Sequence, residues 1–226
     1  MKKIISFGVT LALAISMLAM SGCSFLDDLL GGGKSDFDKA VDNMNNFTLV
    51  TTSYSNPGDN ITYKFTEDKV ELTTVIGTKW WDATDTSDYV LLEQSVNTGY
   101  ALEIKHKSKA EYQSGRKDTM SMLFSCLTQK DDQLELITGR DDYDPTYYTN
   151  KDGANIEFQY NTSEGTVTMV FFNIAIFVKD GQIVSSNSYT SGYSILTTDA
   201  YGKTSTMTIE IRNIGSTEIN LPSYVR

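Results

Sequence analysis

The sequence predicts a mainly β protein with some helix (α+β), built as a large curved antiparallel sheet or half-barrel. A long series of short segments alternates apolar with polar residues, and turn signals separate these segments. Two short amphipathic segments interrupt the series, so we also expect two helices packed on the concave face of the sheet.

The first 22 residues have the pattern of an export signal. Two lysines precede an apolar run from Ile4 to Met20, and Ser21, Gly22 and Cys23 follow. The run is nearly long enough to cross a bilayer, so a permanent transmembrane anchor is the competing interpretation. The ending Met-Ser-Gly-Cys resembles the lipobox of bacterial lipoproteins, although Met20 stands where leucine is usual. The resemblance implies cleavage before Cys23 and attachment of diacylglycerol to its thiol.

Three regions follow from this pattern. We expect residues 1–22 to be a lipoprotein signal peptide and residues 23–34 to be the lipidated Cys23 with a flexible tether. Residues 35–226 are expected to form a single β-rich domain, monomeric and held at the extracytoplasmic face of the bacterial cell membrane. Because the tether contains Gly31, Gly32 and Gly33, its residues after Cys23 would reach roughly 20 Å as a coil.

The charge of the chain argues against one class of partner. The full sequence has 19 basic and 29 acidic residues, and loss of Lys2 and Lys3 with the leader changes the net charge from −10 to −12. Nucleic-acid binding requires clustered basic residues that neutralise phosphates. We therefore expect no nucleic-acid partner, and we expect the lipid on Cys23 to be the contact with the membrane.

Two segments have helical periodicity. Ser35 is a good N-cap for a helix from Asp36 to Asn45, and a second helix is predicted from Asp118 to Gln129. Their apolar stripes comprise Phe37, Ala40, Val41 and Met44 in the first, and Met120, Leu123, Phe124 and Leu127 in the second. Cys126 lies on the second helix, where free cysteine is usually buried as a small apolar side chain; a reactive or intermolecular thiol is the alternative.

From Phe47 onward the apolar residues recur with period two, which is typical of strands. Ile61 to Phe65 and Val70 to Leu72 form a predicted hairpin around Glu67 and Asp68. Further predicted strands are Lys79 to Trp81, Tyr89 to Glu93, Tyr100 to Lys105, Leu134 to Thr138, Ile156 to Tyr160, Thr166 to Val178, Gln182 to Tyr189, Tyr193 to Thr198, Thr204 to Arg212 and Glu218 to Leu221.

This order of elements resembles the LolA/LppX-like lipoprotein-carrier fold. The residues that carry the resemblance are the lipobox, the glycine tether, the short helix before the first strand, the hairpin at Asp180-Gly181, and the ending Thr206 to Pro222. In that family a curved sheet wraps an apolar cavity that holds acyl chains, with helices acting as a lid. The resemblance implies a protein that binds or carries a lipid or a lipid anchor, and it identifies no functional residue.

Two functions are therefore open. In the first, the sheet and helices enclose an apolar cavity for a lipid, and its candidate lining residues are Phe65, Leu72, Met120, Phe124 and Phe158. In the second, the core is filled, and the chain is a non-enzymatic interaction lipoprotein that binds a surface protein or glycan through its loops. The second function predicts an exposed aromatic patch, around Trp80 to Asp88 or around Tyr143 to Tyr148.

Patterns that would indicate an enzyme or a metal site are weak. His106 is the only histidine and is flanked by lysines, so it is expected on the surface. Asp141, Asp142 and Asp144 form an acidic cluster, but the loop around Asp152 does not match a calcium-binding loop. We therefore expect no catalytic residues, no metal and no cofactor.

Trp80 and Trp81 have acidic neighbours, as sugar-binding sites do. Adjacent strand residues point to opposite faces, so the two rings cannot form one platform. We expect one of them in the core and the other exposed.

Overall fold

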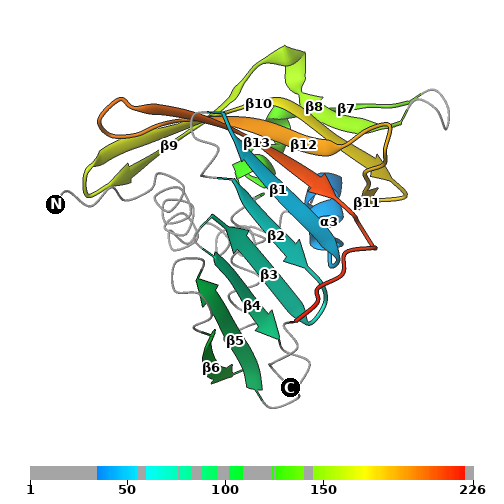
Figure 1. The fold of residues 1–226 in the computed structure, drawn as a ribbon. Helices are drawn as coiled ribbons and strands as arrows, with labels where there is room; N and C mark the ends of the chain where they lie inside the picture. Colours follow the sequence, from blue (N-terminus) through cyan, green and yellow to red (C-terminus); the bar gives the residue numbers. More distant parts are fainter. Residues whose placement is uncertain are drawn as a thin grey trace.

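The strands of this computed structural model join in one large antiparallel sheet that does not close on itself (Figure 1). The structure describes residues 35–54, 60–75, 77–82, 88–95, 102–108, 124, 126–139 and 145–221. The strands are β1 (Phe47–Ser53), β2 (Ile61–Phe65), β3 (Lys69–Thr74), β4 (Gly77–Asp82), β5 (Asp88–Ser95), β6 (Leu102–Ser108), β7 (Leu134–Ile137), β8 (Tyr147–Asn150), β9 (Ile156–Thr162), β10 (Gly165–Lys179), β11 (Gln182–Ile183), β12 (Ser191–Thr198) and β13 (Thr204–Arg212). Their order is β6-β5-β4-β3-β2-β1-β13-β12-β10-β8-β7, and β9 and β11 also pair with β10. The prediction of a mainly β fold is confirmed.

The described helices are short. In α3 (Asp36–Asp42) the Ser35 side chain accepts a hydrogen bond from the Asp38 N–H at 3.1 Å, as an N-cap should, and the helix ends before the predicted Asn45. Of the second predicted helix, Phe124 and residues 126–128 are helical, and Met120 lies outside the described residues. Two 3₁₀ turns are η2 (Asp131–Gln133) and η3 (Lys151–Gly153). Among the described helices none has the length and apolar character of a membrane span.

The predicted strands differ from the observed ones in three places. The run from Gln182 to Tyr189 is a strand only over β11, because the chain then turns into an irregular loop before β12. The segment from Glu218 to Leu221 is not a strand. β8 was not predicted, because Tyr-Tyr-Thr-Asn contains no alternation of apolar and polar residues.

A bulge divides the long strand β10 into two halves. The register against β12 shifts between Phe172 and Ala175, and Asn173 has a positive φ of 51°. Before the bulge Val167, Met169 and Phe171 are buried, whereas after it the buried residues are Ile174 and Ile176. The extra residue therefore changes which side chains of β10 face the core. It also separates the half that pairs with β9 from the half that pairs with β8.

The side chain of Asn150, at the end of β8, bonds to the backbone on both sides of this bulge. Its Oδ1 accepts a hydrogen bond from the Ile174 N–H at 3.1 Å, and its Nδ2 donates to the carbonyl of Phe171 at 3.4 Å and to that of Ala154 at 3.0 Å. The hydrogen bonds to Ile174 and Phe171 are buried, so these two backbone groups would otherwise lack partners. The contact holds β8 against the second half of β10.

One continuous core lies between the sheet and the helices. Apolar residues of α3 and of the second helical segment belong to the same cluster as those of β1, β2, β10, β12 and β13. Phe47 stacks on Phe65 with ring centroids 4.7 Å apart, and Phe124 meets Tyr193 edge-on at 6.3 Å. Burial raises the pKa of the Tyr193 hydroxyl above its ordinary value.

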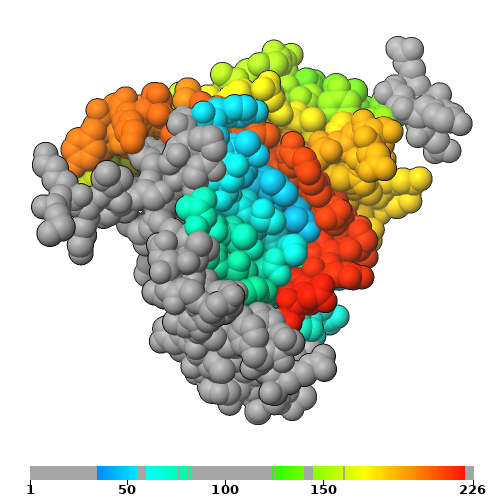
Figure 2. All heavy atoms as spheres, in the orientation of Figure 1, coloured from blue at the N-terminus to red at the C-terminus, as the bar shows by residue number. Residues whose placement is uncertain are grey.

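The segment after β13 lies against β1 (Figure 2). The Asn46 side chain accepts a hydrogen bond from the Thr217 N–H at 2.7 Å and donates to the Thr217 carbonyl at 3.1 Å. The hydroxyls of Thr48 and Thr217 are 2.9 Å apart. These contacts fasten the end of the described chain to the first strand.

The substitution Asn150→Ala should lower the free energy of unfolding by about 2 to 3 kcal/mol, because buried backbone groups at the bulge lose their partners. Urea unfolding measures the change. The control Asn161→Ala, at an exposed position of β9, should remain within about 0.5 kcal/mol of the wild type. An equal effect of the two substitutions would contradict the role assigned to Asn150.

Candidate functional site

The residues predicted to line a cavity are largely part of the packed core. Phe65 and Phe124 are fully buried in it. Phe158 is partly buried, packs edge-on against Phe171 with centroids 5.9 Å apart, and has Lys130 Nζ 5.7 Å from its ring centre. Leu72 is half-buried opposite Tyr63, and Met120 lies outside the described residues. Phe65 and Phe124 thus pack among the other buried side chains of the described core.

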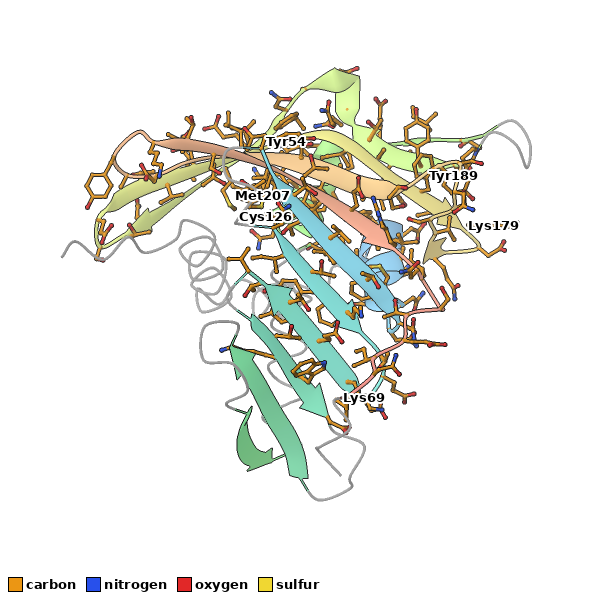
Figure 3. The ribbon with its side chains drawn as sticks, viewed as in Figure 1. Tyr54, Lys69, Cys126, Lys179, Tyr189 and Met207 are labelled. Carbon is orange, nitrogen blue, oxygen red and sulfur yellow. The ribbon has the colours of Figure 1, made fainter. Side chains whose placement is uncertain are left out.

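A groove of about 660 Å³ lies elsewhere, between α3, the β7–β8 hairpin and the ends of β10 and β11. Its apolar lining comes from Ala40, Leu136, Tyr148, Val178 and Val184. Its polar lining is formed by Asp36, Lys39, Asn43, Thr146, Lys179, Asp180 and Tyr189. Figure 3 shows Lys179 and Tyr189 at the same end of the sheet, where β10 and β11 end. The volume is in the range of small-molecule and side-chain binding sites.

Strand pairing and side-chain contacts hold the walls of this groove, the β-sheet and α3, in place. Leu136 and Tyr148 are directly opposite each other in the β7–β8 pair, and Tyr148 is opposite the fully buried Ile176. Tyr148 also meets Phe37 of α3 edge-on at 5.1 Å. On the other wall, the Asn43 side chain donates to the Gly181 carbonyl at 3.3 Å, which ties the end of α3 to the β10–β11 turn.

The charges along the groove balance one another. Lys39 Nζ lies 2.8 Å from Asp36 Oδ1, and this contact lowers the pKa of the Asp36 carboxyl. Lys179 and Asp180 add one charge of each sign. Burial raises the pKa of the Tyr148 hydroxyl, and the nearby carboxylates of Asp36 and Asp131 add to the effect. The groove therefore presents hydrogen-bonding groups and apolar surface without a dominant charge.

Asp38 lies in the first turn of α3, next to the groove wall. Its Oδ1 is buried without a hydrogen-bond partner, and burial raises the pKa of its carboxyl. Hydrogen bonds with Ser35 oppose this shift, whereas the charges of Asp131 and Asp42 add to it. The ionised carboxylate of Asp38 therefore destabilises the folded protein relative to the protonated form.

A row of apolar side chains crosses the opposite face of the same strands. Ile137 is opposite Tyr147, and Tyr147 is opposite Phe177. The ring of Phe177 is 5.4 Å from that of Tyr147 and 4.6 Å from that of Tyr189. Tyr147 falls within the segment where the second function predicts an aromatic patch, but its ring is half-buried.

Trp80 does not offer an exposed platform. It is buried, and its indole N–H donates to Glu71 Oε2 at 3.1 Å. Glu71 Oε1 is in turn 2.8 Å from Lys64 Nζ. The side chain of Trp81 lies outside the described residues, so the expectation that one tryptophan is exposed stays a prediction.

No known family, curated protein or solved structure matches this chain. Its function must be inferred from its own residues.

The other predicted sites are partly outside the described residues. Cys23, the side chain of His106 and the cluster at Asp141, Asp142 and Asp144 lie there. Cys126 is buried, in agreement with the expectation for a cysteine in an apolar segment. The described part of the chain contains no group of three or more His, Cys, Asp or Glu side chains placed to hold a metal ion.

Sequence reasoning did not find the groove. Its wall residues come from α3, β7, β8 and the β10–β11 turn, which are far apart along the chain. The available signals were local: Asp180-Gly181 as a turn, and Leu136 in a strand without an alternating polar neighbour at Ile137. Neither pattern indicates that these segments face one another.

The substitution Phe65→Ala should lower the free energy of unfolding by about 3 to 5 kcal/mol, as expected for a fully buried phenylalanine. Val75→Ala, at a side chain that is 53% exposed, should change it by less than about 0.5 kcal/mol. Urea unfolding of the two variants provides the comparison. A loss below about 1 kcal/mol at Phe65 would indicate an unfilled space around the ring.

The substitution Asp38→Asn should stabilise the protein at neutral pH. The folded-state pKa of Asp38 is raised, so its stabilising contribution is complete below the unfolded pKa and is lost as the pH rises through the folded pKa. The gain in melting temperature of the Asp38→Asn variant over the wild type should therefore be largest at neutral pH and disappear once the solution is acidic enough to protonate Asp38 in both states.

Asp36→Asn is the matched control for this prediction, because the pKa of Asp36 is lowered instead. Its effect should be destabilising at neutral pH and should also fade on acidification. Thermal melts across this pH range measure the change in melting temperature of each variant relative to the wild type. A change of the same sign in both variants at neutral pH would contradict the opposite pKa shifts of Asp38 and Asp36.

Proposed function

We propose that this chain is a lipid-anchored, non-enzymatic binding protein outside the cytoplasm, and that it holds a protein partner in the groove beside α3. The observation that carries the proposal is the contrast between two sites. The positions expected to line a lipid cavity are packed at Phe65 and Phe124, whereas the groove has about 660 Å³ of space with both apolar and polar lining residues. A mixed lining of this kind suits a peptide segment better than an acyl chain.

The anchor and the groove are close along the chain. Cys23 is the proposed lipidation site, and Asp36 of the groove wall follows about a dozen residues later. A coil of that length reaches roughly 20 Å, so the groove would work close to the membrane that holds the lipid. The partner would then be a protein in the same envelope.

We further propose a remote relation to the LolA/LppX-like carriers at the level of fold alone. An open antiparallel sheet with helical segments packed against it is what that resemblance implies. The half-barrel curvature and a second helix covering the concave face are part of this proposal. Carriage of a lipid between the sheet and the helices stays a prediction, and Met120 of its expected lining lies outside the described residues.

Photo-crosslinking tests the site in the cells that make the protein. The photoreactive residue p-benzoylphenylalanine replaces Tyr189 at the groove or Tyr201 at the β12–β13 turn, and the full chain is expressed in each case. Tyr189 comes just before β12 and Tyr201 just after it, so the two tyrosines lie at opposite ends of that strand. We expect one discrete protein adduct from position 189 and none from position 201.

The variant Val178→Asp, which puts a charge on a residue that lines the groove, should abolish the adduct from position 189, and circular dichroism of the variant checks that the chain is folded. Lipid adducts alone, or the same protein adducts from both positions, would overturn the proposal. Mass spectrometry of the adducts distinguishes these outcomes.

A further inference from the structure

The two edge strands of the sheet differ in sequence. β6 forms one end, and its sequence includes Glu103, Lys105 and Lys107, residue types that are common in edge strands. β7 forms the other end, and its sequence is Leu-Glu-Leu-Ile. In the described part of the chain no strand pairs with the outer side of β7.

β7 also exposes large apolar side chains. Leu136 is 48% exposed and Ile137 is 38% exposed, and they point to opposite faces of the sheet. Glu135 is the one charged residue of the strand, and its Oε1 accepts a hydrogen bond from the Asp152 N–H at 3.3 Å. Unpaired backbone groups beside exposed apolar side chains are the features to which an extended segment adds as a further strand.

This edge continues into the groove. Leu136 lines the groove, together with Tyr148 and Val178 from the neighbouring strands. A segment that paired with β7 would place alternate side chains on the groove side, next to Leu136. Its backbone would supply affinity, and the groove would select its apolar side chains.

The size and charge of this surface favour a peptide over a second copy of the chain. β7 has four residues, so pairing between two copies would bury far less than the roughly 1,200 Å² of a stable interface. Two copies of this acidic chain would also repel one another. A neutral or basic segment of another protein meets neither obstacle.

We propose that β7 is a docking edge for an extended, neutral or basic peptide segment of a partner protein, which adds to the sheet as a strand and places its apolar side chains in the groove. The inference rests on the proposed function and specifies how the partner is held.

The test begins with a random library of peptides of roughly six to nine residues, the usual length of a strand. The library is selected on the full chain in detergent micelles and counter-selected on the variant Leu136→Lys. We expect enrichment of sequences that alternate apolar with polar or basic residues. Fluorescence anisotropy of the best peptide should show binding about tenfold weaker to Leu136→Lys, and unchanged binding to the control Val75→Lys at another exposed apolar position.

N-methylation of the peptide isolates the backbone contribution. Methylation of the alternate amides that face β7 should weaken binding by about tenfold or more, whereas methylation of the others should have little effect. Equal effects of both sets, or no enrichment over Leu136→Lys, would overturn the docking edge. If the adduct at position 189 still forms in that case, the groove remains the proposed binding site and only the addition of a strand to β7 is rejected. If neither the adduct nor the peptide binding is observed, both proposals are rejected.

Discussion

The contact between Asn150 and the bulge of β10 is the constraint on which the rest of this end of the molecule depends. A 15-residue strand with uninterrupted pairing would keep one set of side chains on the core face throughout. The extra residue near Asn173 exchanges that set, and two hydrogen bonds from the buried Asn150 amide reach backbone groups of β10 beside the bulge. β8 is therefore held beside the second half of β10. Because β7 pairs with β8, the position of β7 is set by the same contact.

The groove follows from this arrangement. Tyr148 of β8 reaches Phe37 of α3 on one side and stands opposite Leu136 on the other. α3 is itself fixed by its apolar face, since Phe37 and Ala40 belong to the core. The polar residues Asp36, Lys39 and Asn43 of the helix and its end line the groove. A filled core and an open groove are thus two consequences of the same packing, because the helix that fills the space over the sheet also forms the groove wall.

The position of this surface suits a tethered protein. The groove and the edge strand β7 lie at the end of the sheet that α3 covers, and α3 directly follows the proposed tether. The surrounding chain is acidic, whereas the groove carries balanced charges. A partner would consequently be selected by its backbone and its apolar side chains more than by long-range attraction.

The sequence by itself determined the features that depend on neighbouring residues. Ser35 as an N-cap, the hairpin from Ile61 to Leu72 and the turn at Asp180-Gly181 were predictable, because caps, turns and period-two alternation arise within a few residues. The buried state of Cys126 was also predictable from its apolar segment. Only the tertiary structure decided that β8 forms, that β10 changes its inward face, and that Trp80 is buried with Glu71. Each of these depends on a partner in another strand, as when Asn150 bonds to Ile174, 24 positions away. Alternation within one segment cannot show which distant segment will pack against it, and that is why the groove could be found only in the folded chain.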